Sequence, residues 1–444
     1  MEIQAFLTTY DPSDLPGGSI DPLGFERGYL FLADKILPGL TNAANCPRYF
    51  SVLSCGAHLA GDLFHESSRK QYRERLQLIL RLERFWALAN VLASMSQGHD
   101  DKALSGLRGV SYAKTRAEQV LGTGTKLIDS NFKLLSRQVQ YGGIGMYGTV
   151  AEGLRFFERR TLSLTPDLGA KLASGFVKET KLPPRIIKAV EGDERVDGQT
   201  LTEWGMRAHI SGTTRKIEAE CFNDALHLNP VRSRMTQILQ RYPSYEEDTE
   251  LKRLSRIHKG LKGDGDNQDL RDAINCIVKY ETAYRWAMLA LERMLYLSRS
   301  DNTGSVLPKD LEKDAVFESV AQAFPRAVRG FVRAVEKATT ENLGLHAYPI
   351  HDTSQFLENA ASSCENGGDL AQAILDRHGE VQRGKFDKGR RKMPWLELTV
   401  GGRIALTTTR IGGLDTEAKE PKDISPHPYR LNSADALFKA GSSA

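Results

Sequence analysis

The sequence contains one pair of side chains whose types and spacing would suit phosphodiester cleavage. Arg253 and His258 are separated by four residues in a segment with helical periodicity. A guanidinium can polarise a phosphate, and an imidazole can transfer a proton at the leaving oxygen. The alternative is an ordinary solvated helix face, which we favour because a short pattern with two fixed positions often arises by chance.

Two shorter fragments look like parts of metal-dependent nucleases. Glu250-Leu251-Lys252 has the Glu-x-Lys form, and residues 415–419 offer carboxylates beside a lysine. Metal-dependent cleavage needs such groups held on a rigid sheet, whereas the first fragment lies in a helical stretch and the second in a polar tail. The ten histidines show no His-x3-His or His-Glu-x-x-His pairing. We therefore expect no metal site and no cofactor.

The pattern of residues 153–173 indicates a binding element rather than a catalytic site. It begins as the end of a helix, continues as a short two-stranded turn, and ends in a second helix. Leu162 and Leu164 alternate as in a strand. Thr165 can cap the second helix, and Pro166 suits its first position, where no backbone donor is needed. This order is typical of the closing part of a winged helix.

Basic side chains surround this turn, as phosphate-contacting wings often require. Arg155, Arg159 and Arg160 flank the turn. Lys133 and Arg137 lie on the preceding helical segment. A winged helix could use these residues to contact DNA, or it could serve as a protein dock. The alternative is any helix–hairpin–helix element with exposed basic residues.

The densest basic run spans residues 377–395. Its lysines and arginines are interspersed with Phe386 and Trp395, a mixture that suits contacts with a nucleic-acid backbone and stacking on bases. An equally good interpretation is a solvated loop between a helix and a hairpin. The candidate binding residues of this run are Arg383, Lys385, Lys388, Arg390, Arg391, Lys392 and Trp395.

Size and composition indicate a soluble protein of several domains. A chain of 444 residues is too long for one compact core and should form two to four domains. No apolar run approaches the roughly 18 to 20 residues that span a bilayer, and residues 1–6 lack the basic and then apolar pattern of a signal peptide, so we expect a cytoplasmic protein without a membrane partner. The five cysteines are scattered and predict neither disulfides nor zinc. The net charge of +4 is too small to identify a nucleic-acid partner.

The elements that must position these residues are mainly helices. Apolar periodicity predicts a long helix over residues 67–95, with its arginines on the face opposite the core. The glycine-rich residues 141–148 predict a tight turn. Two alternating runs around Gly401-Gly402 predict a β-hairpin. Further helices are expected over residues 25–37, 47–59, 129–139, 149–156, 269–297, 311–338 (kinked or divided at Pro325) and 369–381.

The predicted fold class is mainly α, a multi-domain helical protein with an embedded winged-helix-like module and a small C-terminal β-hairpin. We expect five consecutive regions. They are an irregular N-terminal arm (1–24), an N-terminal helical region (25–100), a winged-helix-like module (101–180), a helical domain (181–345), and a C-terminal region with the basic segment, the hairpin and a polar tail (346–444).

The order of these pieces resembles uncharacterised proteins of bacterial phage-defence islands, which are encoded beside helicases, nucleases or SMC-like ATPases. Three patches carry the resemblance, namely residues 21–25 with 37–41 and 48–53, residues 142–147 with 162–169, and residues 377–395 with 428–431. The resemblance implies a non-catalytic, winged-helix-containing accessory component of an anti-phage system. It implies no catalytic residues.

Three functional hypotheses follow. The first is a non-catalytic DNA-binding adaptor of a multi-protein anti-phage defence complex, with helicase, nuclease or SMC-like ATPase subunits as its protein partners. The second is a nuclease effector, a HEPN-like ribonuclease that uses Arg253 and His258, although Leu254 stands where those enzymes usually have a polar residue. The third is a purely structural, protein-docking subunit without DNA contact.

Overall fold

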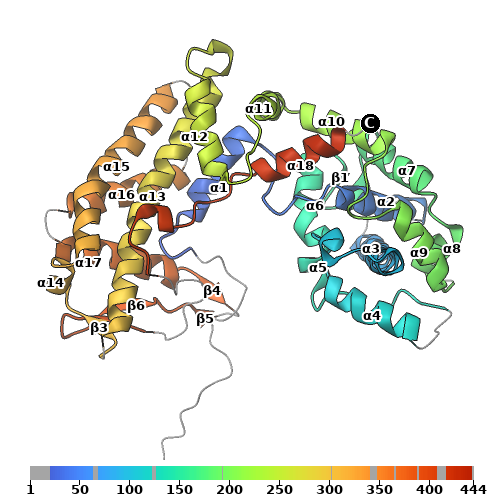
Figure 1. Cartoon of the computed structure of the whole chain (residues 1–444), viewed down its shortest axis with the longest axis horizontal. Coiled ribbons are helices and arrows are strands. Elements are labelled where there is room, and N and C mark those ends of the chain that lie inside the picture. Colours follow the sequence, from blue (N-terminus) through green and yellow to red (C-terminus); the bar gives the residue numbers. More distant parts are fainter. Residues whose placement is uncertain are drawn as a thin grey trace, which may run out of the picture. The chain divides into compact units, whose positions relative to one another are not determined.

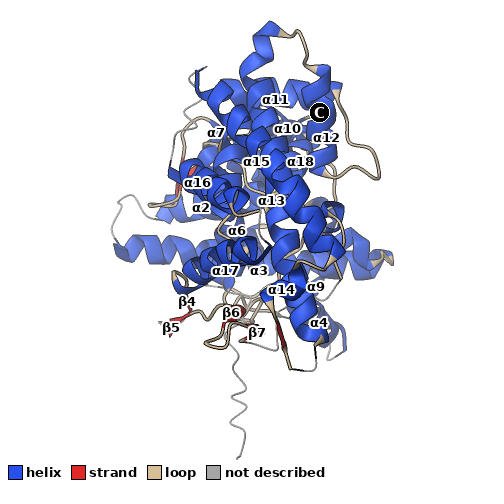
Figure 2. Ribbon diagram, turned by 90° about the vertical axis from the view of Figure 1, so that its left-hand side faces the viewer, coloured by secondary structure: helices blue, strands red, loops and turns tan. Residues whose placement is uncertain are grey.

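The protein is mainly helical, as its sequence predicts. The computed structural model describes residues 21–63, 69–122, 127–192, 194–301, 303–340, 348–364, 367–387, 390–407 and 417–442. Within these residues the strands form only small sheets of two or three strands, and helices make up most of the remainder (Figure 2). No helix among them is both long and apolar enough to cross a membrane.

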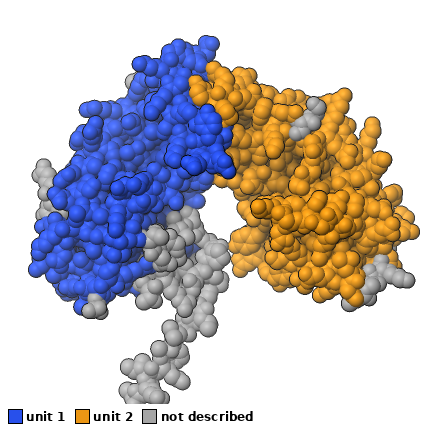
Figure 3. All heavy atoms as spheres, viewed as in Figure 1, with its two compact units in different colours: residues 1–36, 244–429 blue, residues 37–243, 430–444 orange. Residues whose placement is uncertain are grey.

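The chain forms two compact units, each assembled from two separate stretches (Figure 3). Unit 1 contains Met1–Ile36 and Ser244–Tyr429, and unit 2 contains Leu37–Pro243 and Arg430–Ala444. This division differs from the five consecutive regions expected. The reason is that each unit includes a short terminal helix that packs on helices far away in the sequence, and such contacts leave no local signal at a boundary.

Unit 1 is built around one long helix, α13 (Figure 1). Residues of α13 are buried on almost every side because α1, α12, α15 and α17 pack against it. The ring of Phe25 contacts those of Tyr280 and Tyr284 edge-on, at centroid distances of 5.6 and 5.1 Å. The helices of unit 1 are α1 (Glu26–Ile36), α12 (Glu250–Gly260), η3 (Gly265–Asn267), α13 (Gln268–Ser300), α14 (Pro308–Leu311), α15 (Ala315–Thr340), α16 (Tyr348–Ser362), α17 (Gly367–Arg383) and η4 (Pro421–Asp423).

The strands of unit 1 include the predicted C-terminal hairpin. β6 (Leu396–Leu398) and β7 (Ile404–Leu406) pair antiparallel, and β3 (Ser305–Val306) adds a third strand beside β7. A second hairpin, which the sequence did not predict, joins β4 (Phe386–Asp387) to β5 (Arg390–Arg391). Pro325 lies inside α15 and does not divide that helix.

Unit 2 is a helical bundle in which α3 packs against α2, α4, α8 and α9. The 29 residues of α3 include two continuous buried stretches, one from Leu78 to Leu80 and one from Phe85 to Ser94. The elements of unit 2 are α2 (Arg48–Leu63), α3 (Arg69–Gln97), η2 (Asp101–Leu104), α4 (Val110–Gly122), α5 (Gln138–Tyr141), α6 (Gly143–Gly153), β1 (Phe157–Glu158), β2 (Ser163–Leu164), α7 (Leu168–Thr180), α8 (Pro184–Glu191), α9 (Gly198–Arg207), α10 (Lys216–His227), α11 (Pro230–Arg241) and α18 (Leu431–Gly441).

Of the arginines predicted on the face of α3 opposite the core, Arg73 is exposed, but three others are covered by the protein. Arg75 is buried, and Arg81 and Arg84 are half-buried. Each of them bonds to the backbone of another element. Arg81 donates to the carbonyls of Val190 and Glu191, both at 3.1 Å, and so satisfies the C-terminal end of α8. These arginines therefore hold helices together instead of facing solvent.

The glycine-rich segment is a helix, and the predicted helix over residues 129–139 is mostly a loop. Gly143 and Gly145 lie within α6 because neighbouring groups approach its backbone too closely for a side chain. A Cβ on Gly143 would lie 2.9 Å from the Tyr49 ring, and one on Gly145 would lie 2.1 Å from the Gln140 carbonyl oxygen. The buried carboxylate of Glu83 accepts the Gly143 N–H at 2.6 Å and so caps α6.

The C-terminal tail, expected to be polar and partly loose, ends in the helix α18. This helix packs on α10 and α11 within unit 2. The side chain of Arg430 donates to the Leu37 carbonyl at 3.0 Å, and its backbone N–H donates to Asn42 at 2.7 Å. These bonds attach the start of α18 to the first residues of unit 2.

Candidate nucleic-acid interface

The predicted helix–hairpin–helix order is present between α6 and α7 of unit 2. β1 pairs antiparallel with β2, with Phe157 opposite Leu164. Arg75 of α3 donates to the Thr161 carbonyl at 3.1 Å and to the Ser163 hydroxyl at 2.9 Å, so its guanidinium links the β1–β2 hairpin to α3. Leu162 is buried with φ 57°, which reverses the chain between the strands.

The basic residues of this hairpin are balanced by carboxylates. Arg155 lies 3.2 Å from Asp167, and both side chains are about half exposed, at 60% and 47%. The guanidinium of Arg159 donates to the Thr149 hydroxyl at 2.9 Å. Arg160 is exposed and has no hydrogen-bond partner among the described residues. The exposed acids of the same element are Glu152, Glu158 and Asp167. Residues 152–167 thus contain three arginines and three carboxylates, so this segment has no net charge (3 − 3).

Lys133 and Arg137 lie in the loop before α5 and not on a helix of their own. The Lys133 ammonium lies 5.1 Å from the centroid of the Tyr112 ring, a cation–π contact. Hydrogen bonds from Ser136 and Lys133 lower the pKa of the exposed Tyr112 hydroxyl. Both basic side chains are exposed, but they belong to a different segment from the β1–β2 hairpin.

The basic run of unit 1 forms the β4–β5 hairpin, which follows the last residue of α17. Figures 1 and 2 show β4 and β5 next to β6, at one end of unit 1. Between residues 383 and 392 the sequence has six basic residues and one acidic residue, a net charge of +5 (6 − 1). Lys388 belongs to this count but lies outside the described residues.

Two residues predicted to bind nucleic acid instead anchor this hairpin. Lys385 is half-buried, and its ammonium donates to the Asp21 carbonyl. Burial lowers the pKa of Lys385. Trp395 is only 9% exposed, and its backbone N–H donates to Nε2 of His378 at 2.8 Å. The prediction that Trp395 stacks on bases is therefore wrong, since its ring is covered by the protein.

His378 is the central residue of this anchor. It is fully buried, and its Nδ1 lies 3.1 Å from the Pro22 carbonyl oxygen. Because Nε2 accepts the hydrogen bond donated by the Trp395 N–H, the ring must be neutral with its proton on Nδ1. Burial lowers the pKa of His378 to about 4. The ring thus joins the N-terminal residues of unit 1, α17 and the beginning of β6.

An exposed aromatic side chain remains on the hairpin, and the sequence reasoning did not single it out among the candidate residues. Phe386 is 64% exposed, and the guanidinium of Arg391 lies 5.8 Å from its ring centroid. Arg383 at the end of α17 is also exposed and lies 3.8 Å from Glu397. Lys392 is half-buried, and Arg390 pairs through its backbone with Asp387. The alternation of Phe386 with basic residues was the available signal.

Arg253 and His258 project from different faces of one helix. They lie on α12, where five positions correspond to about 140° around the helix axis. Arg253 is buried at 2% exposure, whereas His258 is half-buried on a different face. Burial lowers the pKa of His258, with a smaller contribution from Arg271. In the described part of the chain, no group of three or more His, Cys, Asp or Glu residues is arranged to hold a metal ion.

Comparison with known proteins identifies no relative of this chain. No family model, curated protein or solved structure matches the chain. The functional argument therefore depends on the surfaces described above, and of these the β4–β5 hairpin combines an exposed aromatic ring with the largest local excess of positive charge.

Proposed function

We propose that the protein is a non-catalytic adaptor subunit that binds DNA through the β4–β5 hairpin of unit 1. The observation that supports this proposal is the exposed Phe386 ring beside Arg391, within a run of net charge +5. Arginine and lysine attract the phosphate backbone, and an exposed aromatic ring can stack on an unpaired base. This combination suits single-stranded DNA, whose bases are accessible.

The contribution of Phe386 can be measured directly. Stacking of one base on an aromatic side chain contributes about 1–3 kcal/mol, so Phe386→Ala should weaken binding of a labelled oligothymidine by about 5- to 150-fold. Fluorescence anisotropy at fixed salt would report the affinity. Tyr348→Ala is a matched control, because Tyr348 is similarly exposed, at 67%, but lies on α16. Equal affinities for Phe386→Ala and the unmodified protein would refute the stacking role.

The β1–β2 hairpin has a weaker case for DNA contact and a better one for protein docking. Its three arginines are matched by three carboxylates, and phosphate binding depends on excess positive charge. We expect combined charge reversal of Arg155, Arg159 and Arg160 to change DNA affinity by less than about threefold. A larger loss, with a flatter salt dependence, would restore this hairpin as a DNA-contacting wing.

The resemblance to phage-defence-island proteins supports a place in a multi-protein anti-phage complex. In this proposal the adaptor connects DNA to a helicase, nuclease or SMC-like ATPase subunit. Affinity purification from the native cell after nuclease digestion would test it, because a true subunit remains bound when DNA is removed. Recovery of the protein alone would contradict the adaptor role while leaving DNA binding open.

A purely protein-docking role is the second candidate, and exposed apolar side chains favour it. Met393, Leu398 and Val400 are 66%, 44% and 111% exposed on the segment that includes β6. Apolar side chains exposed this close together often mark a protein contact. If Leu398→Ser with Val400→Ser abolishes partner recovery while the protein shows no DNA affinity, docking replaces DNA binding as the function.

A further inference from the structure

A row of three arginines occupies the outward face of α15, away from the β4–β5 hairpin. Arg326, Arg329 and Arg333 are all exposed. Their spacing of three and four residues places them within about 60° of one another around the helix axis. The opposite face of α15 is buried against α13 through Phe324 and Phe331. We call Arg326, Arg329 and Arg333 the arginine ridge.

No side chain of the ridge has a hydrogen-bond or ion-pair partner among the residues that the structure describes. Two other arginines of unit 1 form short ion pairs. Arg256 lies 2.7 Å from Asp248, and Arg377 lies 2.6 Å from Asp352. A row of like charges at helical spacing destabilises a helix slightly. The ridge therefore contributes nothing visible to the fold, and its guanidinium groups are available to an external anion.

Lys279 of α13 extends the ridge on one side. It is exposed, and its Cδ atom would lie 3.7 Å from a Cβ placed on Gly330 of α15. The lysine side chain thus runs along the flank of α15 between the positions of Arg326 and Arg333. Four cations thus lie near one another on unit 1, and none of them has an ion-pair partner among the residues that the structure describes.

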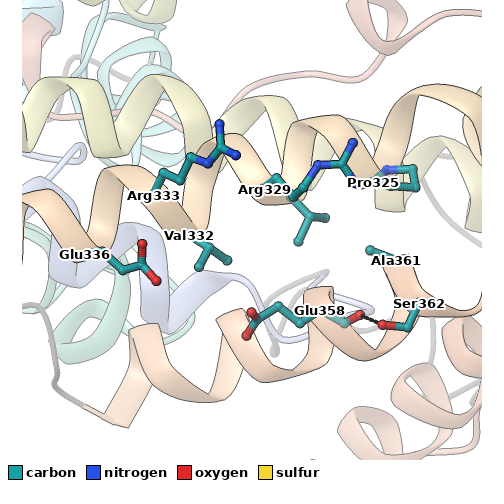
Figure 4. Close-up of a pocket in the computed structure, with 9 residues that line it drawn as sticks. Pro325, Arg329, Val332, Arg333, Glu336, Glu358, Ala361 and Ser362 are labelled. Carbon is teal, nitrogen blue, oxygen red and sulfur yellow. Dashed lines mark hydrogen bonds between the residues drawn. The ribbon is translucent and has the colours of Figure 1, made fainter.

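A groove between α15 and α16 borders the ridge and has a volume of about 420 Å³. Arg329 and Arg333 are among its lining residues, together with Glu336 of α15 and Glu358 of α16 (Figure 4). The two carboxylates oppose binding of an anion inside the groove. A phosphate backbone would therefore contact the guanidinium groups along the solvent-exposed edge of the ridge.

We propose that the arginine ridge, together with Lys279, binds the phosphate backbone of a DNA strand. This inference rests on the proposed DNA-binding function and extends the contact from the β4–β5 hairpin to the helical body of unit 1. The ridge covers eight residues of helix, about 10 Å from Arg326 to Arg333, which is long enough for several phosphates. A guanidinium can hold a phosphate through two parallel hydrogen bonds. Such contacts orient the strand and carry no sequence information.

The salt dependence of binding tests the ridge. For single strands the slope of log affinity against log salt is about −0.7 per phosphate contact, so loss of three contacts should flatten it by about 2.1. We would measure anisotropy of a labelled oligothymidine with R326Q/R329Q/R333Q between about 50 and 200 mM salt. Over that fourfold range the unmodified protein should lose about 20-fold more affinity than the variant.

A control variant separates local contacts from the change in net charge. Lys309→Gln, Lys313→Gln and Lys422→Gln removes three positive charges from exposed sites of the same unit. Lys422 is already paired with Glu420 at 2.6 Å, and Lys313 lies 3.9 Å from Asp310. This control should keep the salt slope of the unmodified protein. If it flattens the slope as much as the ridge variant, the effect is one of overall charge and the ridge is not a site.

These measurements distinguish an error in the ridge inference from an error in the proposed DNA-binding function. If Phe386→Ala weakens binding while the ridge variant keeps both affinity and slope, the ridge inference is wrong and the DNA-binding function stands. If the unmodified protein does not bind oligothymidine, both are wrong. If the ridge variant binds DNA normally but loses an acidic protein partner, the ridge is a protein-docking surface and the inference is also overturned.

Discussion

Protonation of His378 should destabilise unit 1 in acid. Its Nε2 accepts the Trp395 N–H at 2.8 Å, and its Nδ1 faces the Pro22 carbonyl at 3.1 Å. Addition of a proton to Nε2 would break the first bond and leave a buried charge. The unfolded chain has no such constraint and binds the proton near pH 6.5. Acid therefore favours the unfolded state.

The magnitude follows from the shift of the pKa from 6.5 to about 4. A difference of about 2.5 units corresponds to about 3 kcal/mol at 1.36 kcal/mol per unit. Because the folded pKa is lowered, this stabilisation is fully present above about pH 6.5 and decreases as the pH falls. About 2 kcal/mol of it should be lost by about pH 5, and nearly all of it below about pH 4.

The assay is urea-induced unfolding of the protein and of His378→Gln, followed by circular dichroism between about pH 7.5 and about pH 5. Subtraction of the two pH profiles removes the contribution of the carboxylates. The unmodified protein should lose about 2 kcal/mol more than the variant over this range. His351→Gln is the control, because His351 is exposed on α16 and its loss should leave the profile unchanged. Parallel profiles for the protein and His378→Gln would show that this ring is not held neutral by the fold.

Three further predictions concern stability. Burial, with a contribution from Asp423, raises the pKa of Glu292 from 4.5 to about 7. The neutral carboxyl of Glu292 is therefore compatible with the fold below about pH 4.5, and this contribution to stability is lost as the pH rises to about 7. Glu292→Gln should therefore stabilise the protein by about 1–2 kcal/mol at about pH 8, after allowance for partial exposure, and little at about pH 5, as urea unfolding would show. Glu218→Ala would leave the buried Arg48 without its carboxylate at 2.8 Å and should lower the free energy of unfolding by about 3–5 kcal/mol in the same assay. A decrease below about 1 kcal/mol would mean that the pair is solvated. Gly205→Ala would place a Cβ 2.0 Å from a carbonyl oxygen of α3 and should lower the melting temperature, with a cost of about 3 kcal/mol or more; unchanged melting would contradict the close packing of α9 on α3.

Much of the helical architecture could be predicted because helix formation depends on local periodicity. The apolar pattern of residues 269–297 predicts α13, and that of residues 67–95 predicts α3. The β6–β7 hairpin follows from alternation around Gly401-Gly402. The β4–β5 hairpin was missed because its lysines, arginines and glycines lack the apolar alternation of a strand.

Errors arose where a residue's role depends on distant packing. The glycines of α6 are typical of a turn by their local preference, but they lie in a helix, and position 143 requires glycine because the ring of Tyr49 approaches the backbone there. Arg81 resembles a solvent-facing charge by periodicity, although it satisfies the end of α8. The arginine ridge could have been found from the spacing of Arg326, Arg329 and Arg333, since that pattern is visible in the sequence.

The sequence by itself determined where most helices form and where positive charge is concentrated. Only the tertiary structure decided which charges and rings remain available. Trp395 is covered, Arg155 lies against Asp167, and Arg160 is exposed without a partner among the described residues, yet all three are candidates in the sequence. The physical reason is that helix propensity acts over a few neighbouring residues, whereas desolvation and ion pairing depend on groups brought together from distant parts of the chain.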